Sequence, residues 1–204
     1  MTLLLIRHGL TRLGEEGRYQ GALDGGLTEA GRAALRAADF RPARVYLSPL
    51  LRARETAEIL FPGSGQIVIP DLREMNFGDF EGRGWWEMEK DAAYRGWVDG
   101  GCRGRCPNGE DRAEFTARVL LAFDGILRTE AASPGQDQTG APHESPEPTV
   151  VVAHGGTMMA LLGERGEPRR EYWQWQRPCG CGWLLETERG GDRLRVREEL
   201  SFLR

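Results

Sequence analysis

Two histidines follow short apolar runs that are typical of buried strands. His8 comes after the run that ends at Ile6, with Arg7 between them. His154 comes directly after the run that ends at Ala153. In open α/β sheets, ligands bind at the carboxyl ends of the strands. The two histidines are therefore expected to meet in one pocket that is built from distant parts of the chain.

Histidine and arginine together suit phosphate chemistry. Histidine titrates near neutrality, so its neutral ring can attack phosphorus while a cationic neighbour stabilises charge. Arginine presents a planar, permanently charged fork that matches phosphate oxygens. Taken singly, His8 and His154 are equally well explained as hydrogen-bonded core residues at strand ends. Their equivalent positions favour a shared catalytic pocket.

The composition indicates one soluble domain. The chain has 204 residues, of which 28% are charged and 40% hydrophobic, with a formal net charge of -4. A mildly acidic protein without a broad basic surface is not expected to bind nucleic acid. No apolar stretch reaches the length of a membrane span, and the N-terminal run is too short for a signal peptide. We therefore expect a cytoplasmic protein that has no membrane partner.

The four cysteines form no familiar metal-binding pattern. They are spaced as Cys102-x-x-x-Cys106 and Cys179-x-Cys181. Neither spacing matches the common zinc knuckle. Reduced thiols are expected, with a metal site or a disulfide as the alternatives.

Strand and helix patterns alternate along the chain. Strands are predicted at residues 3–6, 44–48, 66–69, 149–153, 183–187 and 194–198, and helices at 29–38, 49–60, 110–130, 157–162 and 168–176. This order predicts an α/β fold, namely a three-layer sandwich with a largely parallel central sheet flanked by helices. We expect a single domain over residues 1–204, with a small helical, lid-like insertion at 83–109 over the active site. Residues 133–148 are rich in Pro and Gly and are predicted to form a mobile loop.

Four motifs resemble those of the histidine phosphatase superfamily, the group that contains the cofactor-dependent phosphoglycerate mutases. The motifs are LIRHGLT ending at Thr11, SPLLRARETA at 48–57, LREMNFGDFEG at 72–82 and VVAHGG at 151–156. They occur in the order of the family and cover nearly the whole chain. The resemblance implies a phosphatase domain that uses no metal and no cofactor.

The resemblance also assigns roles to individual residues. His8 corresponds to the nucleophile that becomes phosphorylated, His154 to the second histidine of the phosphate pocket, and Glu74 to the proton donor. Outside this motif Glu74 would be taken as a solvated carboxylate, and Arg52 as part of a helix-surface salt bridge. The residues expected to bind substrate are Arg7, Arg52, Thr11, Gln20, Gly21 and Gly155.

Two positions depart from the family pattern. Leu10 stands where an acidic or amide residue is common, and Gly14 stands where an asparagine usually helps to hold phosphate. The contacts of this first loop with phosphate are therefore expected to differ from those of the family.

The resulting prediction is a metal-independent phosphomonoesterase that acts on a small molecule through a phosphohistidine. By resemblance, the α-ribazole phosphatase-like branch is the nearest, with α-ribazole 5′-phosphate as a candidate substrate. A phosphoglycerate mutase is the alternative enzyme, and an inactive phospho-ligand-binding protein is the alternative of another class. The oligomeric state stays open.

The aromatic residues of the insertion suggest a preference for ring-bearing substrates. Trp85, Trp86, Tyr94 and Trp97 are expected over the phosphate pocket. Packing of the insertion onto the core is the alternative role for most of them.

Overall fold

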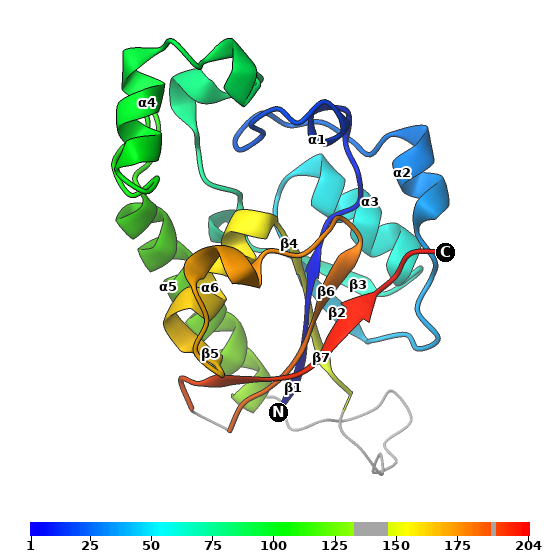
Figure 1. The fold of residues 1–204 in the computed structure, drawn as a ribbon. Coiled ribbons are helices and arrows are strands. Elements are labelled where there is room, and N and C mark those ends of the chain that lie inside the picture. Colours follow the sequence, from blue (N-terminus) through cyan, green and yellow to red (C-terminus); the bar gives the residue numbers. More distant parts are fainter. Residues whose placement is uncertain (133–146, 189–190) are drawn as a thin grey trace.

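A mixed seven-stranded sheet forms the centre of the described structure (Figure 1). The computed structural model describes residues 1–132, 147–188 and 191–204. The strand order is β3-β2-β4-β1-β6-β7-β5. The strands are β1 (Thr2–Arg7), β2 (Arg44–Leu47), β3 (Gly65–Val68), β4 (Thr149–Ala153), β5 (Gly166–Glu167), β6 (Cys181–Glu186) and β7 (Leu194–Ser201). Strands β3, β2, β4 and β1 are parallel, and β6 runs antiparallel to both β1 and β7.

The central strands are apolar on both faces because helices cover both sides of the sheet. Successive side chains of a strand point to opposite faces, so Leu3 and Leu5 share one cluster while Leu4 and Ile6 share the other. Helices α5 (Arg112–Ala132) and α6 (Gly155–Arg165) pack on the first cluster. Helix α3 (Leu51–Leu60) packs on the second. The predicted three-layer α/β sandwich is confirmed.

Several helices differ in length from the prediction. Helix α2 (Glu29–Ala34) has the predicted cap at Thr28 but ends early, because Leu35 is extended and bridges to Leu203. Helix α3 begins at Leu51 and not at the proline of the predicted start, because the backbone of Leu50 is extended. Helix α6 is longer than predicted, since it starts directly after His154.

The segment predicted as a helix at 168–176 is instead a short 3₁₀ helix, η4 (Tyr172–Trp175). Trp175 is fully buried in this turn, and its ring packs edge-on against that of Trp183 in β6 at 5.7 Å. This aromatic contact fixes the position of the segment, although the segment forms only one short helix.

Short helices lie in the loops around the carboxyl edge of the sheet. They are α1 (Arg12–Glu15), η1 (Pro70–Leu72), η2 (Gly78–Phe80), η3 (Trp85–Glu87) and α4 (Ala92–Asp99). The predicted insertion at 83–109 therefore contains η3 and α4. Residues 133–146 of the predicted mobile loop lie outside the described residues.

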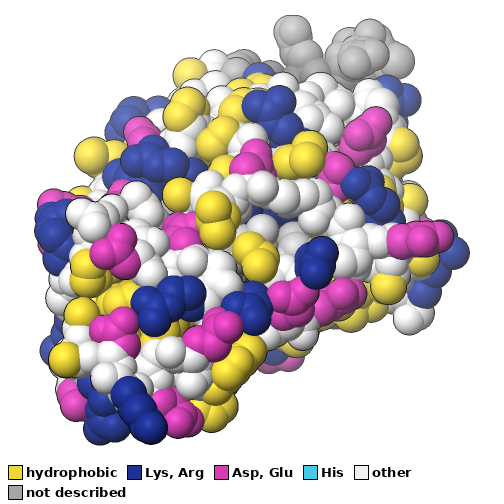
Figure 2. Space-filling view, turned by 90° about the horizontal axis from the view of Figure 1, so that it is seen from above, with side chains coloured by type: hydrophobic (Ala, Val, Ile, Leu, Met, Phe, Trp, Pro, Cys, Tyr) yellow, Lys and Arg dark blue, Asp and Glu magenta, His cyan; other side chains and the backbone are white. Residues whose placement is uncertain are grey.

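The end of the molecule that carries α1 and α4 has a mixed surface. Figure 2 looks onto this end and shows basic and acidic side chains interspersed with apolar ones. Across the described part of the chain, the helices are too short or too polar to cross a membrane.

Candidate active site

The two histidines lie side by side at the carboxyl edge of the sheet. Strands β1 and β4 are paired in register, with Ile6 opposite Val152. The backbone N–H of His8 continues this ladder by donating to Ala153 O at 3.0 Å. The ring centroids of His8 and His154 are 5.1 Å apart. The parallel pairing of the two strands therefore creates the predicted pocket.

The hydrogen bond of His8 defines which ring nitrogen is free to react. Its Nδ1 lies 2.7 Å from the carbonyl oxygen of Gly9. A carbonyl oxygen only accepts, so Nδ1 carries the proton and Nε2 keeps its lone pair. Burial, together with the charges of Arg52 and Arg7, holds the pKa of His8 well below its ordinary value. His8 is thus neutral at physiological pH, the form in which an imidazole can attack phosphorus.

His154 is fixed from the neighbouring strand. Its Nε2 lies 2.6 Å from the hydroxyl of Ser48, which directly follows β2. Its other nitrogen, Nδ1, is buried and has no partner among the described residues. Burial, Arg52 and His8 hold the pKa of His154 well below the ordinary value. The ring is therefore neutral, with one nitrogen held and the other unpaired.

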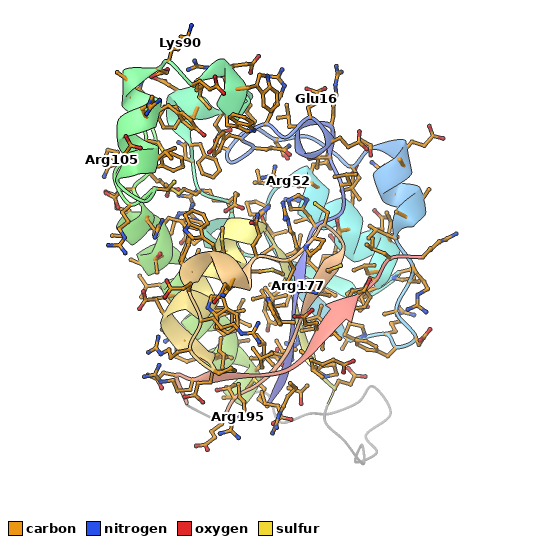
Figure 3. The ribbon with its side chains drawn as sticks, viewed as in Figure 1. Glu16, Arg52, Lys90, Arg105, Arg177 and Arg195 are labelled. Carbon is orange, nitrogen blue, oxygen red and sulfur yellow. The ribbon has the colours of Figure 1, made fainter. Side chains whose placement is uncertain are left out.

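Arg7 and Arg52 bring positive charge to the histidines. Arg7 Nη1 donates to Arg177 O at 2.7 Å. Arg52 is fully buried and donates to the carbonyls of Leu23 and Gly21 at 3.0 and 2.9 Å. Figure 3 shows Arg52 among the segments above the end of β1. These backbone contacts orient both guanidinium groups.

Three nitrogen atoms around His8 lack a hydrogen-bond partner in the described part of the chain: Arg7 Nε, Arg52 Nε and His154 Nδ1. Buried polar groups are nearly always hydrogen-bonded, so such exceptions need an explanation. The charges of Arg7 and Arg52 both act on the two histidines. Arg7 lines the pocket with His8, whereas Arg52 and His154 are not among the lining residues. Unpaired donors near a neutral imidazole suit a group with several oxygen acceptors, such as phosphoryl.

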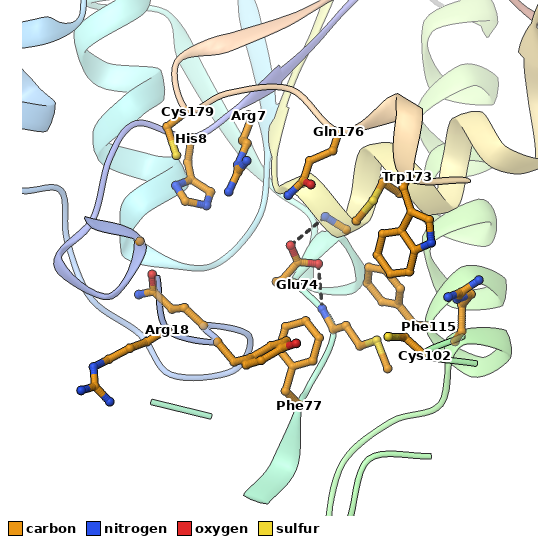
Figure 4. A pocket seen from close by; sticks show the side chains of 18 of the residues that line it. Arg7, His8, Arg18, Glu74, Phe77, Cys102, Phe115, Trp173, Gln176 and Cys179 are labelled. Atoms are coloured by element: carbon orange, nitrogen blue, oxygen red, sulfur yellow. Dashed lines mark hydrogen bonds between the residues drawn. The ribbon is translucent and has the colours of Figure 1, made fainter. Parts of the chain in front are cut away.

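Glu74 is a buried carboxyl group at the same site. Its Oε1 accepts from Met75 N and its Oε2 from Gly156 N, both at 2.9 Å (Figure 4). Burial raises the pKa of Glu74, and this effect outweighs the two N–H donors and the nearby arginines. The raised pKa therefore favours the protonated form of the Glu74 carboxyl group.

Gly156 makes room for this carboxyl group. A Cβ atom at position 156 would stand 2.1 Å from Glu74 Oε1. The glycine is thus needed for the close approach of the α6 N-terminus to the acid.

The site opens into a pocket of about 240 Å³. Figure 4 shows Glu74 between two sides of this pocket. His8, Arg7 and Cys179 lie on one side, and Phe115, Trp173 and Cys102 lie on the other. The pocket therefore has a polar end at His8 and an apolar end beyond the acid.

Comparisons with known proteins agree with this geometry. The family model for the histidine phosphatase superfamily (branch 1) matches residues 3–199. The chain belongs to this superfamily. The predicted class, a phosphoric monoester hydrolase of the histidine phosphatase type, is thereby confirmed at the level of the family.

Relatives within the superfamily have different names. An adenosylcobalamin/alpha-ribazole phosphatase of Salmonella typhimurium is 31% identical, over 96% of this chain and 95% of its own. A glucosyl-3-phosphoglycerate phosphatase of Mycolicibacterium vanbaalenii is 35% identical, over 78% of this chain and 71% of its own. The crystal structure of a phosphoglycerate mutase from Thermus thermophilus is 29% identical, with a TM-score of 0.70 and coverage of 98% and 99%.

Three of the other predicted substrate-binding residues, Thr11, Gln20 and Gly155, line the pocket. Thr11 caps α1 and donates to Gln20 Oε1 at 2.6 Å. Gly21 lies outside the pocket lining, where a Cβ atom would stand 1.8 Å from Met75 O. Gly21 therefore supports the loop through its backbone, and its carbonyl holds Arg52.

Arg118, which the sequence motifs did not indicate, holds the acid of this histidine phosphatase together with Glu110. Arg118 of α5 donates to Glu74 O at 3.0 Å and forms a salt bridge with Glu110 at 2.7 Å. Glu110 in turn accepts from Asn76 N at 2.9 Å. Burial alone would raise the pKa of Glu110, but these donors outweigh it and lower the pKa. Glu110 precedes α5, so no helical spacing in the sequence links it to Arg118.

The aromatic wall of the pocket differs from the one expected. Trp85 and Trp86 are exposed and lie outside the pocket lining, because η3 turns them toward the surface. Tyr94 is buried against Phe80, so it packs the insertion onto the core. Only Trp97 of the expected four residues lines the pocket.

The cysteines of this superfamily member are free thiols. Cys102 and Cys179 line the pocket, and Cys106 and Cys181 are buried. Burial raises the pKa of Cys102 and brings that of Cys106 to about 12. Within the described ranges, no three His, Cys, Asp or Glu side chains gather as a metal site.

Proposed function

We propose that this protein hydrolyses small phosphate monoesters in two steps, through a phosphohistidine at His8 and without a metal. The observation that carries the proposal is a neutral histidine with three nearby nitrogen atoms that have no partner among the described residues. A buried carboxyl group with a raised pKa completes the set. Phosphoryl transfer depends mainly on positioning and on stabilising charge at the equatorial oxygens, and these groups suit both tasks.

In the first step, the lone pair on His8 Nε2 attacks phosphorus. The bond between phosphorus and the ester oxygen breaks, and its electron pair goes to the leaving oxygen. Protonated Glu74 gives its proton to that oxygen, so the product leaves as a neutral alcohol. Arg7, Arg52 and His154 Nδ1 donate to the three oxygens whose charge grows in the transition state.

In the second step, water attacks the phosphorus of phospho-His8. The Glu74 carboxylate takes a proton from the water, while the P–N bond breaks and its electron pair returns to Nε2. Phosphate leaves, and His8 and protonated Glu74 are restored. The fixed arginine charges make this chemistry possible without a bound cation.

We propose α-ribazole 5′-phosphate as the substrate to test first. The relative named for this activity is aligned over nearly the whole of both chains. The pocket of about 240 Å³ falls just below the range of roughly 300–1,000 Å³ that is typical of small-molecule sites. The mutase alternative predicts isomerisation of a phosphoglycerate in the same site.

Phosphate release in the presence of EDTA tests the proposal. The panel is α-ribazole 5′-phosphate, a nucleoside monophosphate and 3-phosphoglycerate, with the His8→Ala protein as the control. We expect phosphate from at least one ester with the wild-type protein and none with the variant. Conversion of 3-phosphoglycerate to 2-phosphoglycerate without phosphate release would favour the mutase. Loss of turnover in EDTA that a divalent metal restores would contradict the metal-free mechanism.

A further inference from the structure

The end of the pocket beyond Glu74 is built mainly from apolar and aromatic side chains, with Arg112 as a charged neighbour. Seven elements or loops contribute to it. Its members are Tyr19, Met75, Phe77, Trp97, Cys102, Phe115, Met159, Tyr172 and Trp173. Phe115 and Met159 are buried and come from α5 and α6, so this wall is part of the core and not a surface patch. The inner part of the wall is therefore packed against the core.

The polar atoms of two of these rings are already used elsewhere. Trp97 Nε1 donates to Gly104 O at 3.1 Å. The hydroxyl of Tyr19 lies 3.0 Å from that of Tyr94. Both side chains therefore present mainly carbon to the pocket. A ligand hydroxyl placed against these two rings would lose water without gaining a partner from them, which is unfavourable.

A cationic residue braces the outer rings of the wall. The guanidinium carbon of Arg112, at the start of α5, lies 4.2 Å from the ring centroid of Tyr172 and 5.2 Å from that of Trp173. Arg112 also donates to Gly101 O. The Tyr172 and Trp173 rings meet edge-on at 5.0 Å. Arg112 thus ties η4 to the loop that carries Cys102, on the far side of the pocket.

Trp173 is the member of the wall with the most free surface. It keeps 53% of its surface exposed although Tyr172 and Arg112 hold it. Its indole can therefore take a further stacking partner without breaking these contacts. Aromatic rings prefer offset or edge-to-face neighbours, and the wall already contains such pairs.

We propose that the apolar end of the pocket selects phosphomonoesters whose alcohol carries an aromatic ring. Trp173 is the specificity-determining residue, and Arg112 is the positioning residue that holds it. The proposal depends on the proposed function in one respect, namely that the phosphate group of the ligand binds at the His8 end of the pocket. A short polyol or hydroxy-acid phosphate fills the same phosphate end but leaves the apolar wall uncovered.

Binding of phosphonates tests the inference without turnover, because their C–P bond is not hydrolysed by this chemistry. The probes are benzylphosphonate, hexylphosphonate and 2-hydroxyethylphosphonate, measured by titration calorimetry. We expect the wild-type protein to bind the benzyl compound about tenfold more tightly than either of the others, the order of one ring-stacking contact. Equal affinity for the benzyl and hexyl compounds would show apolar burial without ring selection and would overturn the proposal.

Matched variants assign the effect to Trp173. Trp173→Ala is expected to remove most of the benzyl preference, and Trp173→Phe to restore much of it. Trp85→Ala is the control, since Trp85 is similarly exposed at 56%, lies in another 3₁₀ helix and does not line the pocket. Thermal unfolding confirms that each variant is folded. A benzyl preference that survives in Trp173→Ala would contradict the assignment.

The role of Arg112 has its own control. Arg112→Met is expected to weaken benzylphosphonate binding, whereas Arg105→Met, which alters a surface salt bridge with Asp111 and Glu114, is not. Equal effects of the two variants would refute the positioning role.

The two proposals fail in different ways. Ring-selective phosphonate binding without turnover of any monoester would refute the proposed function and leave the ring selectivity standing. Turnover of monoesters with no ring selectivity in binding would refute the ring selectivity and leave the proposed function standing.

Discussion

The hydroxyl of Ser48 lies 2.6 Å from Nε2 of His154, so a residue at the end of β2 holds one nitrogen of this ring. The Ser48 oxygen already accepts the backbone N–H of Leu50 at 3.3 Å. A serine hydroxyl has one proton and two lone pairs, so it can also donate to Nε2. The proposed mechanism requires this direction, because it places the ring proton on Nδ1. That nitrogen is the unpaired donor that we assign to the phosphoryl group. We infer that a serine at the end of β2 holds a histidine at the end of β4 in its donor form.

Replacing Ser48 by alanine is expected to lower kcat by about 10- to 100-fold, because His154 then loses its fixed tautomer. Removal of a whole charge-stabilising donor lowers kcat by about 10²- to 10³-fold, and this is the upper limit for the effect of Ser48→Ala. Steady-state kinetics with p-nitrophenyl phosphate measures the effect, with Ser64→Ala as the control in the loop after α3. An unchanged kcat in a folded Ser48→Ala protein would show that the hydroxyl has no positioning role.

Glu74→Gln is expected to slow hydrolysis of alkyl phosphates far more than that of p-nitrophenyl phosphate. An alkoxide needs a proton to leave, whereas nitrophenolate leaves without one. The comparison uses kcat/KM for both substrates in the wild type and the variant. Equal losses on the two substrates would mean that Glu74 is not the proton donor.

The pH dependence follows from the shifted pKa values. His8 must be neutral to attack, and its pKa lies well below the ordinary 6.5 because of burial, Arg52 and Arg7. The fall of kcat/KM on the acid side is therefore expected below pH 6.5. Glu74 must be protonated, and burial raises its pKa above the ordinary 4.5, so activity falls on the alkaline side as pH rises through that raised value.

A pH profile of alkyl phosphate hydrolysis by the wild-type and Glu74→Gln proteins checks this assignment. The titration of the substrate is common to both proteins and is removed by taking the ratio of their rates. We expect the ratio to change through the alkaline limb, where only the wild type loses its acid. A ratio that is constant with pH would rule out Glu74 as the titrating group.

Gly156→Ala is expected to act on the reaction through Glu74. The new Cβ would stand 2.1 Å from Glu74 Oε1, so the carboxyl group must move away from the leaving oxygen. The variant should show the same selective loss on alkyl phosphates as Glu74→Gln. Gly125→Ala in α5 is the control, since its Cβ meets nothing within 4 Å. Full alkyl phosphatase activity in Gly156→Ala would contradict the need for this close contact.

The strand ends could be predicted from the sequence because burial on both faces leaves a clear apolar run. His8 and His154 were found in this way, and β1 and β4 do bring them together. The roles of Glu74 and Arg52 were predicted only from the resemblance to the family, because a single carboxylate or arginine forms no repeating pattern in the sequence. Their roles in the reaction stay predictions until activity is measured.

Contacts between distant elements were the part that the sequence did not reveal. Ser48 and His154 are far apart in the chain, as are Arg112 and Trp173, and no local pattern links either pair. The prediction that Trp85 and Trp86 lie over the pocket was wrong. Their 3₁₀ helix has only 3 residues, one turn, which is too short for a sequence pattern to show which side faces inward. The expected cytoplasmic location stays a prediction.

Trapping the phosphoenzyme tests the central claim most directly. The protein is mixed with a ³²P-labelled monoester, denatured rapidly in base, where phosphohistidine survives, and digested for mapping of the label. The account predicts label on the peptide that contains His8, none in the His8→Ala protein, and retained label in His154→Ala at a lower rate of formation. Continued hydrolysis with no label on His8, or undiminished hydrolysis by His8→Ala, would contradict it.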